Sequence, residues 1–327
     1  MRGLGMLGPL VAVVAVAGCA SATATRTPTT SLAGAPCGAE TTQELAAVDG
    51  MAAERIYQDE LHGPSTMADR HQVEHYAPLL RALSEDNRAA IHTAVKSLVY
   101  SGTHIVRLRV SQNGTLLDDE GGPYIIAPVG GGLSYHGRSV GSYLLSVQDD
   151  RGFVGLETRL IRPPVVLKVH GARLPVWGTI DTGSLQIPAR GAVVLHNHVF
   201  QAYSFTAKAY PTGSLRISLF RPGRSSRQSC TQVKVAETTR IVHLIWGRLK
   251  ADNTAIGEFA GFAESHTGAL TFVRQGTTQL AGSSSPGPTA PPSEGTVVYE
   301  GRSYGVDSFT GTYNSAPVVV YTLVPLG

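Results

Sequence analysis

The chain has 327 residues, of which 42% are hydrophobic and 16% charged, and its formal charge at pH 7 is +3. Charges of both signs are interspersed and no lysine–arginine cluster occurs, so the composition gives no reason to expect a nucleic-acid partner. The sequence also contains no nucleophile elbow, Walker loop or dinucleotide fingerprint, and we therefore expect no cofactor.

The first residues have the features of a processing signal. Arg2 supplies a positive charge, and the apolar run Leu4–Ala17 is too short for a stable membrane-spanning helix. The run ends in V-A-G-C, which resembles the lipobox of bacterial lipoproteins, a group in which the cysteine is diacylated and becomes the mature N-terminus. The resemblance implies a signal peptide over residues 1–18, lipidation of Cys19 and a location on the extracytoplasmic face of the membrane. An ordinary secretory signal cleaved slightly later is the alternative.

The segment after this signal is rich in Thr, Ser and Ala, so residues 19–38 are expected to form a flexible tether. An amphipathic helix is predicted over Thr42–Leu61, and a second helix over Ala68–Leu83. A third helix is expected to begin with Ser84 as its N-cap.

Beyond the third helix the hydrophobic period changes to two. Leu108 and Val110 alternate with Arg107 and Arg109, and Asn113-Gly114 predicts a tight hairpin. The further elements expected in chain order are strands over Tyr124–Pro128, Leu133–His136 and Val140–Val147, a bulge or open bend at Gly130–Gly132, a helix capped by Asp149-Asp150 that ends at Leu160, and a strand from Val165. Long helices followed by a meandering antiparallel sheet indicate an α+β fold.

Three segments of this region, H-I-V-R-L-R-V, G-G-P-Y-I-I-A-P-V and G-R-S-V-G-S-Y-L-L-S-V-Q-D-D, resemble extracytoplasmic PDC/Cache-type sensor modules of actinobacteria and their relatives. The later segments G-A-V-V-L and A-Y-S-F-T-A-K-A-Y-P-T-G-S-L-R-I-S-L fit the same group, so the likeness covers roughly residues 40 to 222. The resemblance implies a PAS-like sheet with long N-terminal helices and a pocket for a small solute. The amino-acid-binding signature of the family, an arginine followed closely by Trp-Tyr, is absent, so no ligand class is implied.

Polar residues between apolar neighbours of the expected sheet are the candidates for lining this pocket. They are Arg107, Arg109, Tyr124, Tyr135, Arg138, Tyr143, Asp149 and Asp150. An arginine there could hold a carboxylate with two hydrogen bonds. The alternatives are arginines that are solvated on an outer sheet face and aspartates that only cap a helix.

The second half of the chain repeats the first at an offset of 104 residues. The matches need no gap and include Val169 with Val273, Gly178 with Gly282, Gly183 with Gly287, Pro188 with Pro292, and Leu219 with Leu323. The repeat predicts a sensor module over residues 39–222, a linker over residues 223–229, and a truncated, strand-rich second copy over residues 230–327.

The cysteines fit this arrangement. With Cys19 lipidated, Cys37 and Cys230 are the two remaining thiols, and each stands just before the first helix of its copy. Export would place them where disulfides persist. We therefore predict a Cys37–Cys230 disulfide between two helices that lie side by side and parallel; two unpaired cysteines or an intermolecular bridge are the alternatives.

The stretch G-T-I-D-T-G-S, from Gly178, resembles the strand and turn that present a catalytic aspartate in aspartic proteases. Its counterpart in the second copy is Ser285-Pro286-Gly287-Pro288, which keeps the glycine and has no aspartate. Because a two-lobed protease needs a carboxylate from each lobe, the stretch is interpreted as a turn that needs glycine. No enzyme is expected, and a protease that uses Asp181 remains a third alternative.

The segment His71-Gln72-Val73-Glu74-His75 has the spacing of a helical zinc motif. No third ligand can be assigned from the sequence, so the segment is interpreted as a solvated helix face and no metal site is expected. The sequence as a whole predicts a lipid-anchored, non-catalytic protein that binds a small-molecule solute and relays to a separate membrane partner. The alternative is a structural or adhesive envelope protein without a ligand.

Overall fold

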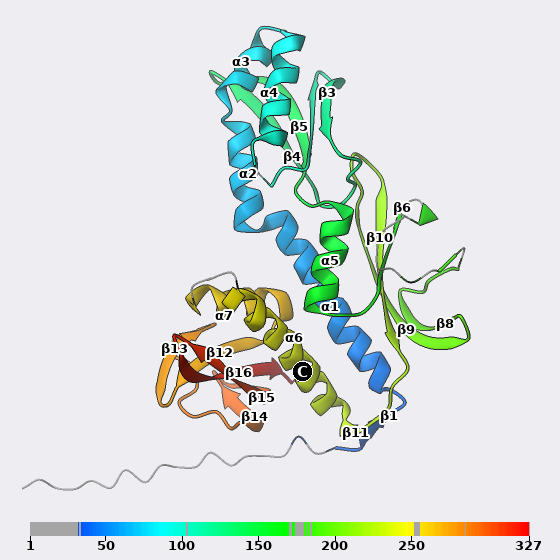
Figure 1. Ribbon diagram of the computed structural model, residues 1–327, viewed down its shortest axis with the longest axis vertical. Helices are drawn as coiled ribbons and strands as arrows, with labels where there is room; N and C mark the ends of the chain where they lie inside the picture. The colour runs from blue at the N-terminus through cyan, green and yellow to red at the C-terminus, as the bar shows by residue number, and fades with distance from the viewer. Residues whose placement is uncertain are drawn as a thin grey trace, which may run out of the picture.

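The computed structural model describes residues 32, 34–102, 104–169, 172–173, 180, 182–183, 185–251, 256–284 and 286–326. Cys19 and Asp181 lie outside the described residues, and so do the predicted lipidation and the protease alternative. The predicted α+β fold is confirmed. Helices and antiparallel sheets alternate along an elongated molecule (Figure 1).

The first copy contains two sheets, one above the other in Figure 1. Its helices are α1 (Thr41–His62), α2 (Pro64–Glu74), α3 (Ala77–Ser84), α4 (Arg88–Tyr100) and α5 (Asp150–Leu160). The strands β2 (Arg107–Gln112), β3 (Thr115–Gly121), β4 (Pro128–Tyr135) and β5 (Arg138–Ser146) form a four-stranded sheet in the order β3-β2-β5-β4, here called the upper sheet. The strands β6 (Val165–Val169), β7 (Ala172–Arg173), β8 (Arg190–Leu195), β9 (His198–Lys208) and β10 (Ser214–Pro222) form the first five-stranded sheet.

In the part that the structure describes, the second copy has two helices and one sheet. They are α6 (Cys230–Ala251) and α7 (Ile256–Thr267), followed by β12 (Leu270–Gln275), β13 (Thr278–Gly282), β14 (Glu294–Tyr299), β15 (Arg302–Tyr313) and β16 (Ala316–Pro325). The sheet order β13-β12-β16-β15-β14 repeats the order β7-β6-β10-β9-β8 of the first copy. The second copy is therefore truncated as predicted, because the described residues place no counterpart of α2–α4 or of the upper sheet in it.

The register of the strands shows where the repeat is regular. Arg190 pairs with Tyr203, and Glu294 pairs with Asp307, so β8–β9 and β14–β15 are displaced by the predicted 104 residues. The last strand is not. Leu219 lies opposite Tyr203, whereas Leu323 lies opposite Val306, the counterpart of Ala202. The ungapped match through Leu323 is therefore wrong by one residue, because the β15–β16 turn is one residue shorter than the β9–β10 turn.

Two helix boundaries differ from the sequence prediction. The helix predicted over Ala68–Leu83 is divided, because Pro78 has no N–H for the Glu74 carbonyl and its ring would clash there. The next helix starts after Asn87, whose side chain accepts a 3.1 Å hydrogen bond from Ala90 N. Ser84 is not its N-cap; its hydroxyl donates to the Arg81 carbonyl instead.

The glycines of β4 also differ from the predicted bulge or open bend, since Gly130–Gly132 continue a strand that begins at Pro128 and pair with β5 in regular register. A Cβ on Gly131 would lie 2.8 Å from the ring of Tyr143 and 2.9 Å from Glu74 Oε1. The glycine therefore lets the strand pass close beneath these side chains. The predicted strand over Tyr124–Pro128 is wrong, because residues up to Ala127 form a loop.

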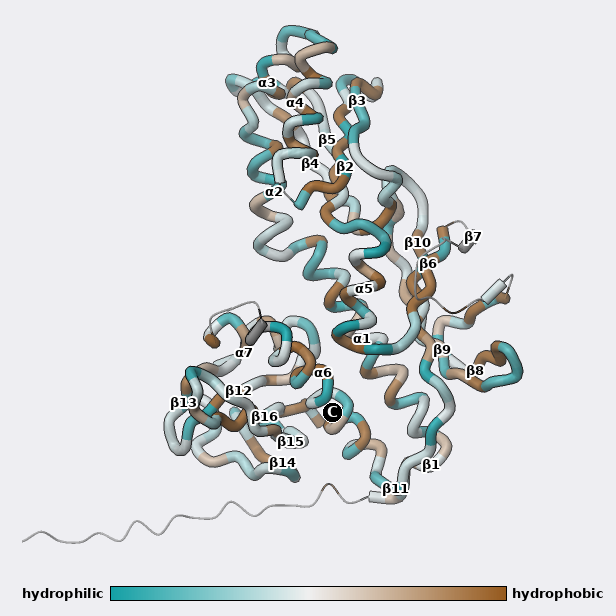
Figure 2. Tube along the Cα trace, in the orientation of Figure 1, coloured by the Kyte–Doolittle hydropathy of each residue, from teal (hydrophilic) through white to brown (hydrophobic). Residues whose placement is uncertain are grey.

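One continuous core joins the two copies. Tyr57 of α1 is fully buried near its middle, with its ring centroid 5.5 Å from Phe153 and 6.0 Å from Phe205. The strand β6, which has the sequence V-V-L-K-V, is hydrophobic in Figure 2 and packs into the same core. Among the described residues, none of the helices combines the length and the hydrophobicity that crossing a bilayer requires.

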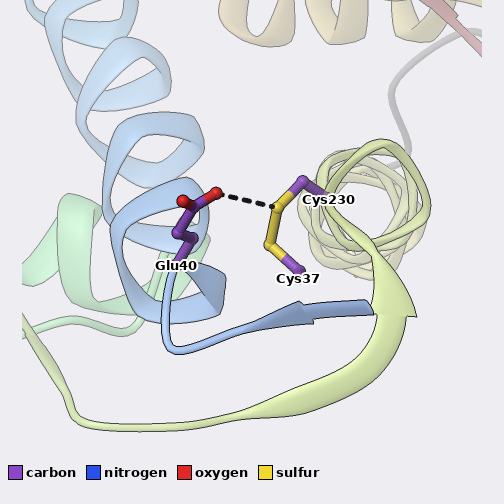
Figure 3. Close-up of side chains that lie close together, drawn as sticks. All are labelled: Cys37, Glu40 and Cys230. Carbon is purple, nitrogen blue, oxygen red and sulfur yellow. Dashed lines mark hydrogen bonds between the residues drawn. A yellow bond between two sulfur atoms is a disulfide. The ribbon is translucent and has the colours of Figure 1, made fainter. Parts of the chain in front are cut away.

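The predicted disulfide is confirmed. Cys37 and Cys230 are bonded, with their Cα atoms 4.7 Å apart, and α1 and α6 run side by side from this bond (Figures 1 and 3). Glu40 Oε2 lies 3.8 Å from Cys230 Sγ, a contact without a proton because a disulfide sulfur carries none. The end of the predicted tether and the predicted linker meet here as β1 (Pro36–Gly38) and β11 (Ser226–Ser229), which pair antiparallel.

A buried ionic cluster also joins the copies below the core. Asp49 of α1 is fully buried between Arg221 of β10, at 3.0 Å, and Arg240 of α6, at 3.3 Å. Burial raises the pKa of Asp49. Burial would also raise the pKa of Glu237, but the hydrogen bond from Arg240 and the charges of both arginines outweigh it and lower that pKa. The two carboxylates and the two arginines thus tie α1 and β10 of the first copy to α6 of the second.

Candidate functional site

The candidate site lies on the face of the upper sheet that its helices leave uncovered. On β2, Leu108 and Val110 are fully buried, and Arg107 and Arg109 project to the opposite side because successive strand residues alternate. Arg109 lies directly opposite Leu144 of β5. The predicted alternation therefore places both arginines on one face.

Arg107 is held in place by two residues that the sequence did not indicate. Its Nε and Nη2 donate to Asp119 Oδ1 and Oδ2 at 2.8 and 2.9 Å, and its guanidinium lies 4.7 Å from the centroid of the Tyr210 ring. The Tyr210 hydroxyl donates to Asp119 Oδ1 at 3.3 Å. The hydrogen bonds with Asp119 raise the pKa of Arg107, while burial and the charge of Asp119 raise that of Tyr210. Arg107 is thus a neutralised, structural cation.

Arg109 is different. Its Nη1 is 3.9 Å from Asp119 Oδ2, and within the described part of the chain its guanidinium makes no hydrogen bond. Since Arg107 already neutralises Asp119, this group of three residues carries one surplus positive charge. That charge faces an open cavity.

The cavity has a volume of about 400 Å³ and lies between the upper sheet and the β9–β10 turn. It is lined by Arg109, Ser111, Ser142, Tyr143, Leu144, Pro211 and Thr212. The hydroxyls of Ser111, Ser142 and Thr212, like the guanidinium of Arg109, have no hydrogen-bond partner among the described residues. A guanidinium and hydroxyls that converge without partners suit a small anion, above all a carboxylate.

Of the remaining predicted residues, Tyr143 touches this cavity but directs its hydroxyl elsewhere. The hydroxyl donates to Glu74 Oε1 of α2 at 2.6 Å and is 3.4 Å from Arg70 Nε. Burial and the bond to Glu74 raise the pKa of Tyr143 to about 12. Tyr143 pairs with Val110, so its ring lies on the helix-covered face, away from the two arginines.

The other five predicted residues are not gathered at the cavity. Tyr124 lies in the loop before β4 with its ring close to Gly122, and Tyr135 and Arg138 face each other at the β4–β5 turn. Asp149 is the N-cap of α5, which is the alternative that the sequence left open for it, and its side chain accepts a hydrogen bond from Gly152 N at 2.7 Å. Asp150 accepts from Ile125 N at 3.3 Å. A ligand role for these five residues stays a prediction.

A larger cavity, of about 670 Å³, opens where the first copy meets the second. Its charged residues come from α1, α5, α6 and α7 and include Asp59, Glu60, Arg159, Arg248 and His266. His266 Nε2 lies 3.8 Å from Asp59 Oδ2. Burial raises the pKa of Glu60 and lowers that of His266. Because charges of both signs oppose one another here, this cavity selects a ligand class less clearly than the cavity beside Arg109.

The two enzyme-like motifs of the sequence differ in how much of each the structure describes, because Asp181 lies outside the described residues. His71 and His75 stack on the exposed side of α2, with ring centroids 4.0 Å apart, and Glu74 is engaged by Tyr143. At the protease-like turn, Gly183 has the φ of 48° that a tight turn requires. Its counterpart Gly287 has no such φ. It is glycine for another reason, since a Cβ there would clash with the ring of Phe272.

No protein-family model and no curated protein matches the chain. Among solved structures, the chain is similar to the extracellular domain of vpHK1S-Z8, a protein described as a histidine kinase. The identity is 13%, the TM-score is 0.36, and the match covers 56% of this chain and 93% of that one. A second similar structure is the ligand-binding domain of the Pseudomonas fluorescens chemoreceptor CtaA in complex with L-alanine, at 13% identity and a TM-score of 0.30, covering 55% and 94%.

A third similar structure is the ligand-binding domain of Mlp24 with asparagine, at 9% identity and a TM-score of 0.29, covering 62% of this chain and 98% of that one. By their descriptions, the first of these three structures is an extracellular domain, and the second and third are ligand-binding domains.

Proposed function

We propose that this protein is a non-catalytic, extracytoplasmic sensor module that binds a small carboxylate-bearing solute in the cavity beside Arg109. The observation that supports this is the guanidinium of Arg109, which faces the cavity without a hydrogen-bond partner while the neighbouring Arg107 is fully engaged. In this proposal Arg109 holds the carboxylate, and Ser111, Ser142 and Thr212 orient the remainder of the solute.

The proposal includes lipid anchoring at Cys19 and relay of the signal to a separate membrane partner, with sensor module and second copy divided at residues 223–229. A Cys19→Ala variant should leave the membrane fraction. If that variant remains in the membrane fraction as fully as the unaltered protein, lipid anchoring at Cys19 is wrong. The proposal of solute binding would then still be supported by the cavity beside Arg109.

Ligand binding is tested by thermal shift with a panel of small carboxylates that includes amino acids and dicarboxylates. A ligand at a hundred times its dissociation constant should stabilise the protein by about 2.7 kcal/mol. Arg109→Ala should abolish that shift, and Arg302→Ala, which removes an exposed arginine at the start of β15 in the second copy, is the matched control.

The competing functions give different outcomes. A structural or adhesive envelope protein would show no shift with any member of the panel. A protease that uses Asp181 would show pepstatin-sensitive hydrolysis of a peptide library that is lost in Asp181→Ala.

A further inference from the structure

A second cluster of ligating side chains lies on the other face of β3, between that strand and α4. His92 comes from α4, and Asp118 and Glu120 come from β3. Because alternate strand residues share a face, these two carboxylates point to α4 while Asp119 between them points to Arg107. The cluster is thus separate from the cavity beside Arg109.

The distances in this cluster are those of ligands around a metal ion. His92 Nδ1 lies 3.4 Å from Asp118 Oδ2 and 3.3 Å from Glu120 Oε1, and one ligand atom from each residue lies within 4.8 Å of the other two. His92 Nδ1 also makes a hydrogen bond of 3.4 Å with Asp118 Oδ1, which is longer than the about 2.7–2.9 Å of a charge-assisted hydrogen bond. A tetrahedral ion with bonds of about 2.0–2.1 Å separates its ligand atoms by about 3.3–3.4 Å.

The charges of the cluster are also not balanced by the protein. Among the described residues, no lysine or arginine forms an ion pair with Asp118 or Glu120. Arg88, one turn before His92 on α4, directs its Nη1 to the Leu116 carbonyl at 3.5 Å. The side chain of Asp118 is only 14% exposed, and its buried Oδ2 accepts no hydrogen bond. A desolvated carboxylate of this kind gains most from a cation.

We propose that His92, Asp118 and Glu120 form a binding site for a divalent metal ion of the zinc type. One imidazole nitrogen and two carboxylate oxygens suit zinc better than magnesium or calcium, which prefer oxygen ligands alone. The side chain of His92 is 51% exposed, so the fourth position opens to water. The site does not depend on the proposed binding of a carboxylate solute.

The test is calorimetric titration of the mature protein with zinc chloride in a buffer that does not chelate metals. We expect one zinc ion per chain, with affinity reduced at least tenfold in His92→Ala and in Glu120→Gln. Glu120→Gln keeps the shape of the side chain, and circular dichroism of both variants tests whether the fold is retained.

His71→Ala is the matched control, because it removes one of two stacked and exposed histidines on α2. It should bind zinc as the unaltered protein does. The proposal is overturned if the unaltered protein binds no zinc, if His92→Ala and Glu120→Gln bind it unchanged, or if His71→Ala is the variant that loses it.

Discussion

The two five-stranded sheets share one strand order, and both strands of β14–β15 are displaced by 104 residues from those of β8–β9. They differ at the turn before the last strand. In the first copy, residues 209–213 reach up to the loop before β4 of the upper sheet, where Tyr210 N donates to the Ile125 carbonyl at 2.8 Å. In the second copy, Asn314 and Ser315 close a tight turn with φ of 47° and 63°.

This difference shows which elements form the candidate cavity. The shared strands provide a frame, and the candidate cavity forms only where the first copy has both an upper sheet and a longer turn to meet it. Pro211 and Thr212 of that turn line the cavity, and Tyr210 positions Arg107 behind it. The second copy, which has a similar frame and a shorter turn, has no described counterpart of the upper sheet to enclose a ligand.

The largest effect is expected from separating the copies. Cys37→Ser removes a covalent link across 193 residues, which in the chain-entropy treatment costs about 5 kcal/mol of unfolding free energy. Urea unfolding of the variant and of the unaltered protein measures the difference. A loss below about 1 kcal/mol would show that the packing of α1 on α6 alone joins the copies.

The turn provides the second test. Replacing residues 209–213 by the four residues 313–316 of the shorter turn removes Tyr210, a buried aromatic residue, and should cost about 3 kcal/mol. Lengthening the Asn314-Ser315 turn by one residue is the control and should cost under about 1 kcal/mol. Urea unfolding measures both losses. If they are equal, the β9–β10 turn contributes no more to stability than the β15–β16 turn does.

Two buried ionisable residues, Glu157 of α5 in the first copy and His266 of α7 in the second, are expected to make the stability depend on pH in opposite directions. In α5, Glu157 is fully buried without a hydrogen bond, and burial raises its pKa, whereas in α7 burial lowers the pKa of His266. The folded state holds the Glu157 proton longer than the unfolded state does. Its stabilising contribution is therefore complete below pH 4.5 and is lost as pH rises through the raised pKa.

Glu157→Gln should remove this loss, so that its stability relative to the unaltered protein increases by up to about 1.4 kcal/mol per pH unit above pH 4.5. Thermal unfolding between pH 4 and 8 measures the slope. Parallel curves for the two proteins would mean that Glu157 titrates as it does in water.

The smallest effect is expected at the hairpin tips. Val194 and Val298 occupy equivalent positions and are 61% and 67% exposed. Replacing either with Thr should change the unfolding free energy by under about 0.5 kcal/mol, because neither side chain is packed. A loss above about 1 kcal/mol at one tip only, in urea unfolding, would show that the two hairpins are not equivalent.

Local patterns in the sequence predicted much of this fold. Period-two alternation placed Arg107 and Arg109 on one face, Asn113-Gly114 gave the β2–β3 turn, and the repeat placed Cys37 beside Cys230. The division of the predicted helix Ala68–Leu83 into α2 and α3 could also have been predicted from Pro78, because a proline within a helix removes a backbone hydrogen bond.

The partners of Arg107 could not be predicted in this way. Counting back from the Asn113-Gly114 turn places Asp118 opposite Arg109, but a bulge leaves Leu117 unpaired and brings Asp119 opposite Arg109 instead. Tyr210 reaches Asp119 across 91 residues of sequence from a turn of a different sheet. A bulge and a long-range contact each depend on packing that no local pattern contains.

The position of the disulfide determines which part of the chain can bear mechanical tension. A pull between the two ends passes from residue 37 through the sulfur atoms to residue 230, and bypasses everything between them. The upper sheet, the cavity beside Arg109 and the His92 cluster all lie inside that closed loop and remain unloaded while the second copy stretches. Reduction would place the loop in the path of the force and release roughly 650 Å of extended chain.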